Sequence, residues 1–355
     1  KYFFVQVRLP LDALFTMQQL IEVIQGERKH MREPLRIGTL GAAGITPAAL
    51  MEPAKEIDGV VVAAVAARDR NRAEQFAERH HIPLVYDHYD SVIADDSLDV
   101  IYNPLPISHH LEYTVKALRA GKHVLCEKSF ALNAREAEEM HAVAQDTGLV
   151  LIEAFHYRYH PIFQRALEIV ESGTLGKLEH IDARFVVGTP NAENIRMHYD
   201  TGGGATMDMG CYPISWLRHI TREEPKVVAA TAKIGNPDVD LRLEVDYQLQ
   251  DGLTATTVGS MCDPGFAADM EIRGSDGHMR VVNPLVPQHG NKIELTVGTD
   301  SSEEEFTRRS TYAFQLEAFV DAVENGTQLP TDSADAVKQM RVIDAAYLAA
   351  GMKTR

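Results

Sequence analysis

A lysine, an aspartate and a tyrosine in the chain carry side chains that could move a proton together. Asp208 and Tyr212 are four positions apart, so they share one face if the segment is helical, although Pro213 would distort the following turn. Tyrosine alone is a poor base, but an adjacent ammonium such as that of Lys128 would stabilise its phenolate and hydrogen-bond a substrate oxygen. Oxidation of an alcohol needs such a base, because the hydroxyl proton must leave when hydride leaves the carbon. Taken singly, the same residues could be a surface lysine, an acid at a helix N-terminus and a packed tyrosine.

A turn with two glycines follows the first apolar segment. Leu35–Leu40 leads into Gly41-Ala42-Ala43-Gly44-Ile45, and a helix is predicted over Pro47–Ile57. A tight turn at this point directs helix-terminal N–H groups at a pyrophosphate. Ala43 stands where a second glycine would normally let the backbone approach the phosphates. The sequence therefore predicts a dinucleotide site here, the alternative being an ordinary strand–helix turn.

The end of the second apolar segment bears on the choice between NAD and NADP. NAD enzymes commonly place a carboxylate there to bind the ribose hydroxyls, whereas this chain has Ala67 followed by Arg68. An arginine can hold a 2′-phosphate or stack on adenine, and the small alanine leaves room for the phosphate. We therefore expect NADP to be preferred, with NAD possible. In the alternative, Asp69 binds the ribose and Arg68 is a solvated surface charge.

Two patterns of hydrophobic residues divide the chain into two domains. Continuous apolar segments joined through helices run from residue 35 to residue 152 and predict a parallel sheet covered on both faces. Beyond Phe155 the residues alternate between apolar and polar, which predicts a mostly antiparallel sheet, followed by helices at Tyr312–Asn325 and Ser333–Ala349. The predicted fold is α/β, with an extension (1–33), a parallel-sheet domain (34–155) and an α+β domain (156–355) that carries a large open sheet.

Composition and charge exclude several classes of function. The formal net charge of −16 repels nucleic acid and anionic lipid, so neither is an expected partner. The sequence contains no run of about 18 apolar residues, so no transmembrane helix is expected. Cys126, Cys211 and Cys262 are odd in number and far apart, so we expect no disulfide framework, no metal site and a cytoplasmic location. The acidic run Ser301-Ser302-Glu303-Glu304-Glu305 is interpreted as a solvated turn.

Three longer segments together resemble a known family. They are Asp99-Val100-Ile101-Tyr102-Asn103-Pro104-Leu105-Pro106 with Ala120-Gly121-Lys122-His123-Val124-Leu125-Cys126-Glu127-Lys128, then Glu153-Ala154-Phe155-His156-Tyr157-Arg158-Tyr159-His160-Pro161, and Gly202-Gly203-Gly204-Ala205-Thr206-Met207-Asp208-Met209-Gly210-Cys211-Tyr212-Pro213. In this order and spacing they resemble the glucose–fructose oxidoreductase / inositol dehydrogenase / MocA (Gfo/Idh/MocA) family. The branch resembled contains dimeric dihydrodiol dehydrogenases and NADP-dependent xylose dehydrogenases, and the similarity spans about residues 35–352.

The resemblance implies a fold, a reaction and roles for particular residues. It implies an N-terminal Rossmann domain, an open-sheet domain that often forms a homodimer, and hydride transfer between the nicotinamide and a hydroxyl-bearing carbon of a sugar, polyol or cyclic diol. Lys128 matches the lysine of the family's Glu-Lys-Pro motif, Asp208 the active-site acid, and Tyr212 the proton-transferring residue. Ser129 replaces the proline of that motif. The Lys128–Ser129 bond is then either trans with Lys128 repositioned or a strained cis bond, or Ser129 hydrogen-bonds the cofactor or substrate.

The candidate site residues fall into two overlapping groups. For the cofactor they are Gly41, Ala42, Ala43, Gly44, Ile45, Ala67, Arg68, Asn103, Pro104, Leu105, His110, Glu127 and Lys128. For the substrate they are His156, Arg158, His160, Tyr199, Asp208 and Tyr212. His156 and His160 have a metal-like spacing, but no accompanying glutamate makes a metal motif, so a place in the substrate pocket is preferred. Two other functions stay open: a reductase of an imine or unsaturated substrate, and a silent NADP-binding sensor.

Overall fold

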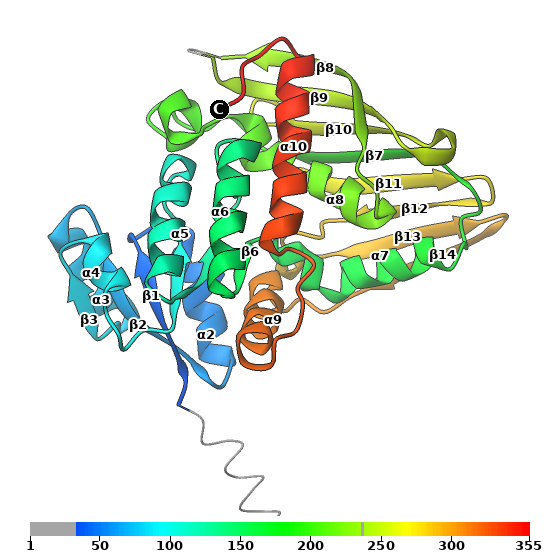
Figure 1. The fold of residues 1–355 in the computed structure, drawn as a ribbon. Helices are drawn as coiled ribbons and strands as arrows, with labels where there is room; N and C mark the ends of the chain where they lie inside the picture. The colour runs from blue at the N-terminus through cyan, green and yellow to red at the C-terminus, as the bar shows by residue number, and fades with distance from the viewer. Residues whose placement is uncertain (1–32, 236–237) are drawn as a thin grey trace, which may run out of the picture.

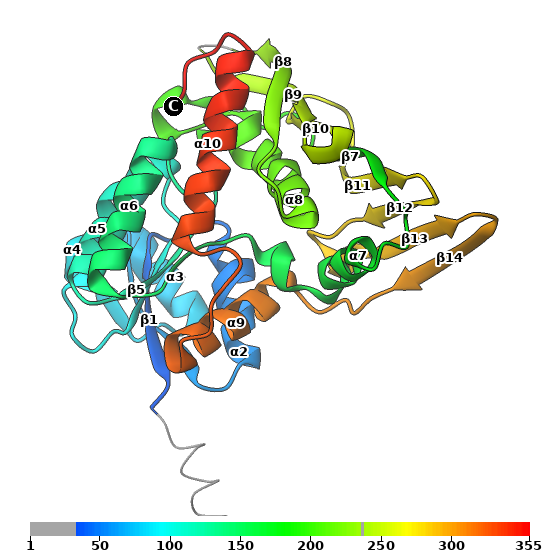
Figure 2. The same cartoon turned by 45° about the vertical axis from the view of Figure 1, so that its right-hand side comes forward.

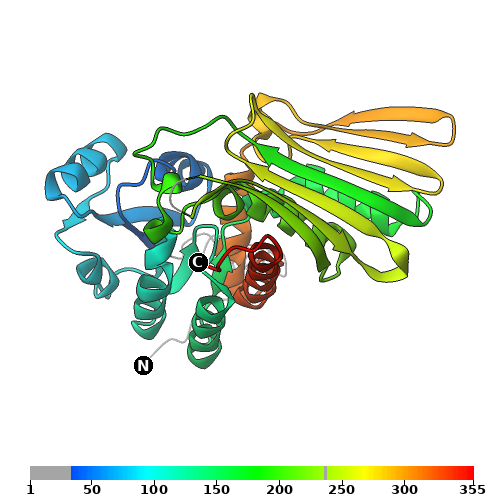
Figure 3. The same cartoon turned by 90° about the horizontal axis from the view of Figure 1, so that it is seen from above.

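The computed structural model, which describes residues 33–235 and 238–355, contains two sheets that lie side by side (Figures 1 and 3). The first is fully parallel with the order β3-β2-β1-β4-β5-β6. Its strands are β1 (Leu35–Leu40), β2 (Val60–Ala66), β3 (Leu84–Tyr86), β4 (Val100–Asn103), β5 (His123–Cys126) and β6 (Leu151–Glu153). The order reverses between β1 and β4, and ligands of such sheets bind beyond the strand ends at this point. The expected N-terminal extension lies outside the described residues except for residue 33.

Helices cover both faces of this sheet, as the continuous apolar strands predict. One face carries α5 (His110–Arg119) and α6 (Ala134–Thr147), and the other carries the short π-helix η1 (Pro47–Met51) and α9 (Thr311–Asn325). The remaining helices of this region are α2 (Glu52–Glu56), α3 (Arg70–His80) and α4 (Tyr89–Ile93). Helix α9 comes from the C-terminal part of the chain, which therefore returns to cover the first sheet (Figure 1).

The second sheet is antiparallel except where β7 and β10 pair in parallel, and its order is β14-β13-β12-β11-β7-β10-β9-β8. Its strands are β7 (Leu178–Val186), β8 (Lys226–Ile234), β9 (Asp240–Gln248), β10 (Thr254–Ser260), β11 (Ala267–Gly274), β12 (Gly277–Val282), β13 (Lys292–Val297) and β14 (Asp300–Glu305). Helices α7 (Pro161–Glu171), α8 (Cys211–Thr221) and α10 (Ser333–Ala349) lie on one side of it (Figure 2). The two sheets confirm the predicted α/β fold class. No helix of the described residues is long and apolar enough to cross a bilayer.

The interpretation of Ser301–Glu305 as a turn is wrong. These residues belong to β14, which pairs with β13 from Asp300 to Glu305. Five of its six residues are exposed, so no apolar alternation identified the strand. A charged edge strand of this kind protects the sheet from pairing with another chain, which explains why its composition is that of a turn.

Helix α8 was not predicted because it lacks a polar face. Ten of its eleven residues are buried, among them Trp216 with 0% exposure. Pro213 is the third residue of α8, and the turn directly before α8 is the π-helix η6 (Thr206–Gly210), so the helix is irregular on the N-terminal side of the proline. This π-helix lies against β10, because Gly259 of that strand would place a Cβ 2.5 Å from the Gly210 Cα.

Candidate active site

The turn after β1 forms one end of the site. Gly41 has φ +92°, and a Cβ there would lie 3.2 Å from Leu105 Cδ2, so both backbone and space favour glycine. The predicted residues Gly41, Ala42, Ala43, Gly44, Ala67, Arg68, Pro104 and Leu105 line one concavity at this end of the sheet. An extended nucleotide fits such a cradle of open backbone at a topological switch point.

The carboxylate of Asp69 has a structural partner in this region. Its Oδ1 accepts hydrogen bonds from the N–H groups of Asn71 at 2.8 Å and Arg72 at 3.3 Å, which makes it the N-cap of α3. Arg68 is exposed and lines the concavity. Arg72, which sequence reasoning missed, also lines it and donates from Nη2 to the Ala42 carbonyl at 2.8 Å. Two guanidinium groups therefore face the region where the strand-end carboxylate of an NAD enzyme would stand.

Two residues that were predicted to bind the cofactor are instead buried beneath the loops that surround the site. Asn103 and His110 are both fully buried, and neither lines the cofactor concavity or the neighbouring cavity. His110 Nε2 lies 2.8 Å from the Leu105 carbonyl and Nδ1 lies 3.0 Å from the Ser129 carbonyl. Burial lowers the pKa of His110 to about 4, so the ring is neutral. With one N–H it donates to the carbonyl on one side only, and it packs between the loop after β4 and the loop that carries Lys128.

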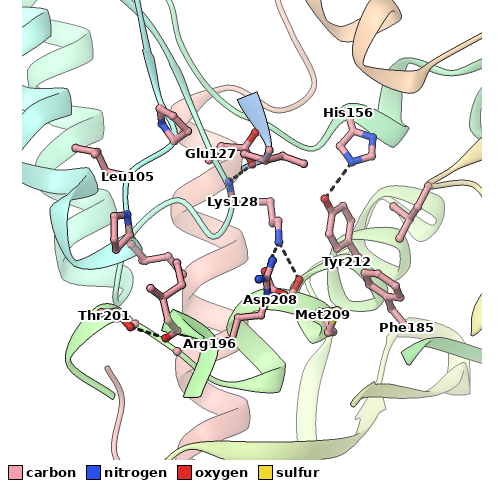
Figure 4. A pocket seen from close by; sticks show the side chains of 18 of the residues that line it. Leu105, Glu127, Lys128, His156, Phe185, Arg196, Thr201, Asp208, Met209 and Tyr212 are labelled. Atoms are coloured by element: carbon pink, nitrogen blue, oxygen red, sulfur yellow. Dashed lines mark hydrogen bonds and ion pairs between the residues drawn. The ribbon is translucent and has the colours of Figure 1, made fainter. Parts of the chain in front are cut away.

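A cavity of about 270 Å³ lies beside this concavity, between the two sheets. It is lined by the predicted residues Ile45, Pro104, Leu105, Glu127, Lys128, His156, Asp208 and Tyr212 (Figure 4). Pro104, Leu105, Pro106 and Ile195 line both hollows, so the two form one continuous site. The loop after β4 is the shared wall.

Lys128 and Asp208 form an ion pair at the centre of the cavity. Lys128 Nζ donates to Asp208 Oδ1 at 2.7 Å and to the Asp208 carbonyl at 3.0 Å, and Arg196 Nε donates to the other carboxylate oxygen. Burial favours neutral forms, but the two cations hold the pKa of Asp208 below its usual value. In the same way Asp208 outweighs burial and raises the pKa of Lys128. Both residues are therefore charged at neutral pH.

Tyr212 has a different partner from the one expected. Its hydroxyl lies 3.0 Å from His156 Nε2, while Lys128 Nζ lies 5.3 Å from the centroid of its ring (Figure 4). Burial raises the pKa of Tyr212 well above 10, so the hydroxyl is protonated at rest. The expected stabilisation of a phenolate by Lys128 is thus not present in this arrangement, because the ammonium is engaged by Asp208.

Asp208 and Tyr212 do face one cavity, although not on one regular helix. Asp208 lies in the π-helix η6 and Tyr212 in the first turn of α8, and both line the cavity. Ser129 does not contact this space. It is fully buried, and its hydroxyl donates to the Met207 carbonyl at 2.8 Å, so the expectation of a bond to cofactor or substrate is corrected. The Lys128–Ser129 peptide bond is cis.

Three predicted substrate residues do not line the cavity. Arg158 lies over the ring of Phe163, 5.5 Å from its centroid. His160 is fully buried and caps α7, accepting the Ile162 N–H at 3.3 Å. Tyr199 donates its hydroxyl to a backbone carbonyl, that of Thr354, at 2.9 Å. Their proximity in sequence to His156 or to the glycine-rich segment was misleading, because a short 3-10 turn and a cap direct their side chains elsewhere.

Several cavity residues were missed because they come from loops, short helical turns and elements distant in sequence. They are Ile107, Phe185, Ile195, Arg196, Thr201, Met209, Leu285, Val286 and Tyr312. Arg196 lies in a 3-10 turn, Ile195–Met197, where no motif or periodicity marks it. Within the described residues no cluster of three or more His, Cys, Asp or Glu side chains could hold a metal ion.

Comparisons with known proteins identify the family. A family model described as an oxidoreductase family with an NAD-binding Rossmann fold matches residues 35–155, and one for the GFO/IDH/MocA C-terminal domain matches residues 163–280. The D-xylose 1-dehydrogenase (NADP(+)) 2 of Haloferax volcanii is 35% identical, over 88% of this chain and 96% of its own length. The trans-1,2-dihydrobenzene-1,2-diol dehydrogenase of Xenopus tropicalis is 31% identical, over 63% of this chain and 68% of its own.

Solved structures agree with this result. A 3-ketoreductase from Actinomadura kijaniata, crystallised in complex with NADP and TDP-benzene, superposes with a TM-score of 0.84 at 27% identity, over 89% of this chain and 98% of that one. The first of these family models spans all six strands of the parallel sheet, and the second spans β7 to β11 and part of β12. The predicted resemblance is confirmed, and the chain belongs to the Gfo/Idh/MocA family of oxidoreductases.

Proposed function

We propose that this oxidoreductase prefers NADP and moves hydride between the nicotinamide and a hydroxyl-bearing carbon of a sugar, polyol or cyclic diol. The observation that carries the proposal is the continuity of the two hollows. The Gly41–Gly44 turn and Arg68 line one, and Lys128, Asp208 and Tyr212 line the other. A dinucleotide in the first hollow would present its reactive end to the three proton-handling side chains in the second.

The preference for NADP is supported by the side chains at the end of β2. Asp69 is engaged as the cap of α3, and Arg68 and Arg72 supply positive charge beside the small Ala67. A 2′-phosphate is bound well by guanidinium groups. Relatives named for NADP use, the xylose dehydrogenase and the 3-ketoreductase, point in the same direction.

The chemistry of the cavity follows from which groups hold protons. When bound, the oxidised nicotinamide accepts the hydride of the alcohol carbon. Lys128 stays protonated beside Asp208, so it donates a hydrogen bond to the substrate oxygen and stabilises negative charge there. In reduction the protonated Tyr212 hydroxyl gives its proton to the substrate oxygen. In oxidation Tyr212 takes the hydroxyl proton as a phenolate, after its own proton has left for solvent. Asp208 keeps the ammonium aligned.

The walls of the cavity favour a substrate with one polar edge. Lys128, Asp208 and Tyr212 supply polar atoms, whereas Phe185 and Leu285 are apolar. A ring that presents hydroxyl groups to the first set and C–H groups to the second fits this division. The relatives named for xylose and dihydrobenzenediol act on molecules of that kind.

A homodimer built on the outer face of the second sheet and a cytoplasmic location are part of the same proposal. The outer face is not apolar, contrary to the condition on which a partner was expected. Asp269 accepts hydrogen bonds from Arg184 at 2.6 Å and from Arg280 at 2.6 Å across neighbouring strands. The proposal of a dimer therefore rests on the resemblance alone. Cys126 and Cys211 are buried free thiols, which agrees with a reducing compartment.

A panel of substrates tests the proposed function. Purified protein is mixed with NADP or NAD and with sugars, polyols and cyclic diols, and the reduced nicotinamide is followed by absorbance. Turnover of at least one alcohol, faster with NADP, is expected. Reduction of an imine or an activated double bond without alcohol turnover would replace the proposal with the reductase function. Binding of NADPH without any turnover would identify a sensor.

A further inference from the structure

A chain of three side chains begins at the Tyr212 hydroxyl and leads away from the cavity. Tyr212 Oη lies 3.0 Å from His156 Nε2, and His156 Nδ1 lies 2.7 Å from Thr311 Oγ1 (Figure 4 shows the first of these contacts). Thr311 in turn donates to the Leu285 carbonyl at 3.2 Å. The residues come from α8, from the 3-10 turn His156–Tyr159, and from the first position of α9. The assigned roles of Lys128, Asp208 and Tyr212 do not use His156 or Thr311.

The direction of each hydrogen bond follows from the available donors. His156 is 3% exposed, and burial together with the charge of Lys128 lowers its pKa to about 3, so the imidazole is neutral and has one N–H. Thr311 uses its hydroxyl hydrogen on the Leu285 carbonyl, so Oγ1 accepts from Nδ1–H. The other nitrogen, Nε2, then carries the lone pair. Tyr212 must donate its hydroxyl hydrogen to it.

The charged groups around the ring favour the same neutral state. The positive charges of Lys128 and His160 both lower the pKa of His156. Among the described residues, no acidic side chain raises it noticeably. Tyr312 stacks against the imidazole with 3.9 Å between ring centroids and an angle of 35°. Because Thr311 holds one nitrogen and Tyr312 holds the face, the ring cannot readily turn.

We propose that His156, backed by Thr311, is a positioning residue that fixes the Tyr212 hydroxyl as a hydrogen-bond acceptor toward the substrate. With its own hydrogen held by Nε2, Tyr212 presents oxygen lone pairs to the cavity, where the hydroxyl of an alcohol donates to them. The arrangement orients the Tyr212 oxygen toward the substrate hydroxyl before the substrate arrives. This inference rests on the proposed alcohol oxidation, but the protonation pattern of His156 exists without substrate.

The first test reads the tautomer directly. Nitrogen-15 NMR of the whole protein labelled at histidine, in its complex with NADPH, gives the ring signals of His156, assigned by their loss in His156→Gln. A neutral ring with the hydrogen on Nδ1 is expected around neutral pH. A hydrogen on Nε2, or an imidazolium, would overturn the inference. This measurement does not depend on finding a substrate, so its failure is distinct from failure of the proposed function.

The second test separates positioning from structural support by matched variants. His156→Gln keeps an acceptor for Tyr212, and His156→Phe removes it. The expected size of the effect is taken by analogy from metal sites, where groups that orient a functional histidine are typically worth roughly 10- to 100-fold in activity. We expect a loss of this size in kcat for His156→Phe, with KM and NADPH affinity nearly unchanged, and recovery of most of kcat in His156→Gln. A kcat for His156→Phe within about twofold of the wild type would refute the role.

A second pair of variants guards against misfolding of His156→Phe. Thr311→Val removes the acceptor for Nδ1–H, whereas Thr311→Ser keeps it. Thr311→Val should lower kcat and shift the His156 nitrogen signals, and Thr311→Ser should do neither. Equal losses of kcat in the two variants, with unchanged His156 signals, would show that Thr311 only supports α9 and would remove it from the proposal.

Discussion

The ammonium nitrogen of Lys128, in the loop after β5, lies 2.7 Å from Oδ1 of Asp208 in η6, across 80 positions of sequence. Each side chain is about 15% exposed, so solvent screens the pair little. Because the pair keeps Lys128 protonated, the lysine is a donor and cannot itself take the proton of an alcohol. That task falls to the oxygen of Tyr212, which lines the same cavity and can take a proton once its own has left.

The first prediction concerns Lys128 and Tyr212 as one proton-transfer unit. Tyr212→Phe should lower turnover about 10²- to 10⁴-fold, the usual value of general acid–base assistance, and leave NADPH affinity nearly intact. Lys128→Met should cost at least as much, because it removes both a hydrogen-bond donor and a positive charge. Steady-state kinetics of both variants and of the double variant measure this.

The double variant decides whether the two residues act in one step. If they do, it should lose far less than the product of the single losses. Fully multiplicative losses would show independent roles, which the separate hydrogen bonds of Lys128 to Asp208 and of Tyr212 to His156 make a real alternative. Near-normal turnover in Tyr212→Phe would mean that His156, and not Tyr212, transfers the proton.

The second prediction concerns the selectivity between NADPH and NADH. Arg68→Ala should weaken NADPH binding by roughly 10- to 100-fold and NADH binding little, because charge-assisted hydrogen bonds are worth about 1.5–3 kcal/mol. Fluorescence titration with each cofactor measures both constants. Arg70→Ala is the matched control, since the Arg70 guanidinium is paired with Glu74 and Asp87 outside the concavity. Equal losses for both cofactors in Arg68→Ala would mean that Arg68 only stacks on adenine.

The sequence predicts the first sheet and its cofactor turn because local chemistry determines them. Strands such as Val60–Ala66 are apolar throughout, and Gly41 occupies a backbone conformation that few other residues adopt. The resemblance adds Lys128, Asp208 and Tyr212, which no local pattern would bring together. Their presence in one cavity depends on the packing of the second sheet and η6 against the loop after β5.

What the sequence does not reveal is set by tertiary packing. Arg196 reaches Asp208 because the loop after β7 crosses the cavity, and loop paths leave no periodic signal. The partner of Tyr212 depends on how α9 places Thr311 behind His156. Arg158 and His160 were assigned to the substrate from their neighbourhood in sequence, but a 3-10 turn and a helix cap occupy them instead.

The third prediction concerns Arg196, which sequence reasoning missed. Arg196→Ala should raise KM and lower kcat/KM roughly 10-fold or more, because Asp208 loses one of its two cationic partners and the pKa of its carboxyl rises. The same kinetic assays measure it. Arg184→Ala, on the outer face of the second sheet, is the control and should leave both constants unchanged. Unaltered kinetics in Arg196→Ala would exclude it from the site.

The fourth prediction is a homodimer formed through the outer face of the second sheet. Light scattering should give about twice the mass of 39.4 kDa at micromolar concentration. Ion pairs within each subunit, such as Arg184–Asp269 and Arg280–Asp269, already neutralise charges on that face, so added salt should change the dimer little. A monomer at micromolar concentration contradicts the prediction.

The fifth prediction is that buried histidines make the fold sensitive to acid. Burial lowers the pKa of His110 to about 4, of His156 to about 3 and of His160 to about 4, against 6.5 for an exposed ring. Below pH 6.5 the unfolded chain therefore binds more protons than the folded one. The free energy of unfolding is highest above that pH and falls as the pH drops toward 4. Each ring contributes a slope of about 1 kcal/mol per pH unit in that window.

One variant isolates a single ring from this slope. His160 caps α7 through Nδ1, and asparagine is among the best capping residues, so His160→Asn keeps the cap and removes the titrating group. Urea unfolding at several values between pH 6.5 and pH 4 should show a shallower decline for His160→Asn, by about 1 kcal/mol per pH unit. His278→Asn, at an exposed position of β12, is the control and should follow the wild type. Parallel declines for the wild type and His160→Asn would mean that His160 is protonated in the folded protein, and the acid sensitivity would then originate in other groups.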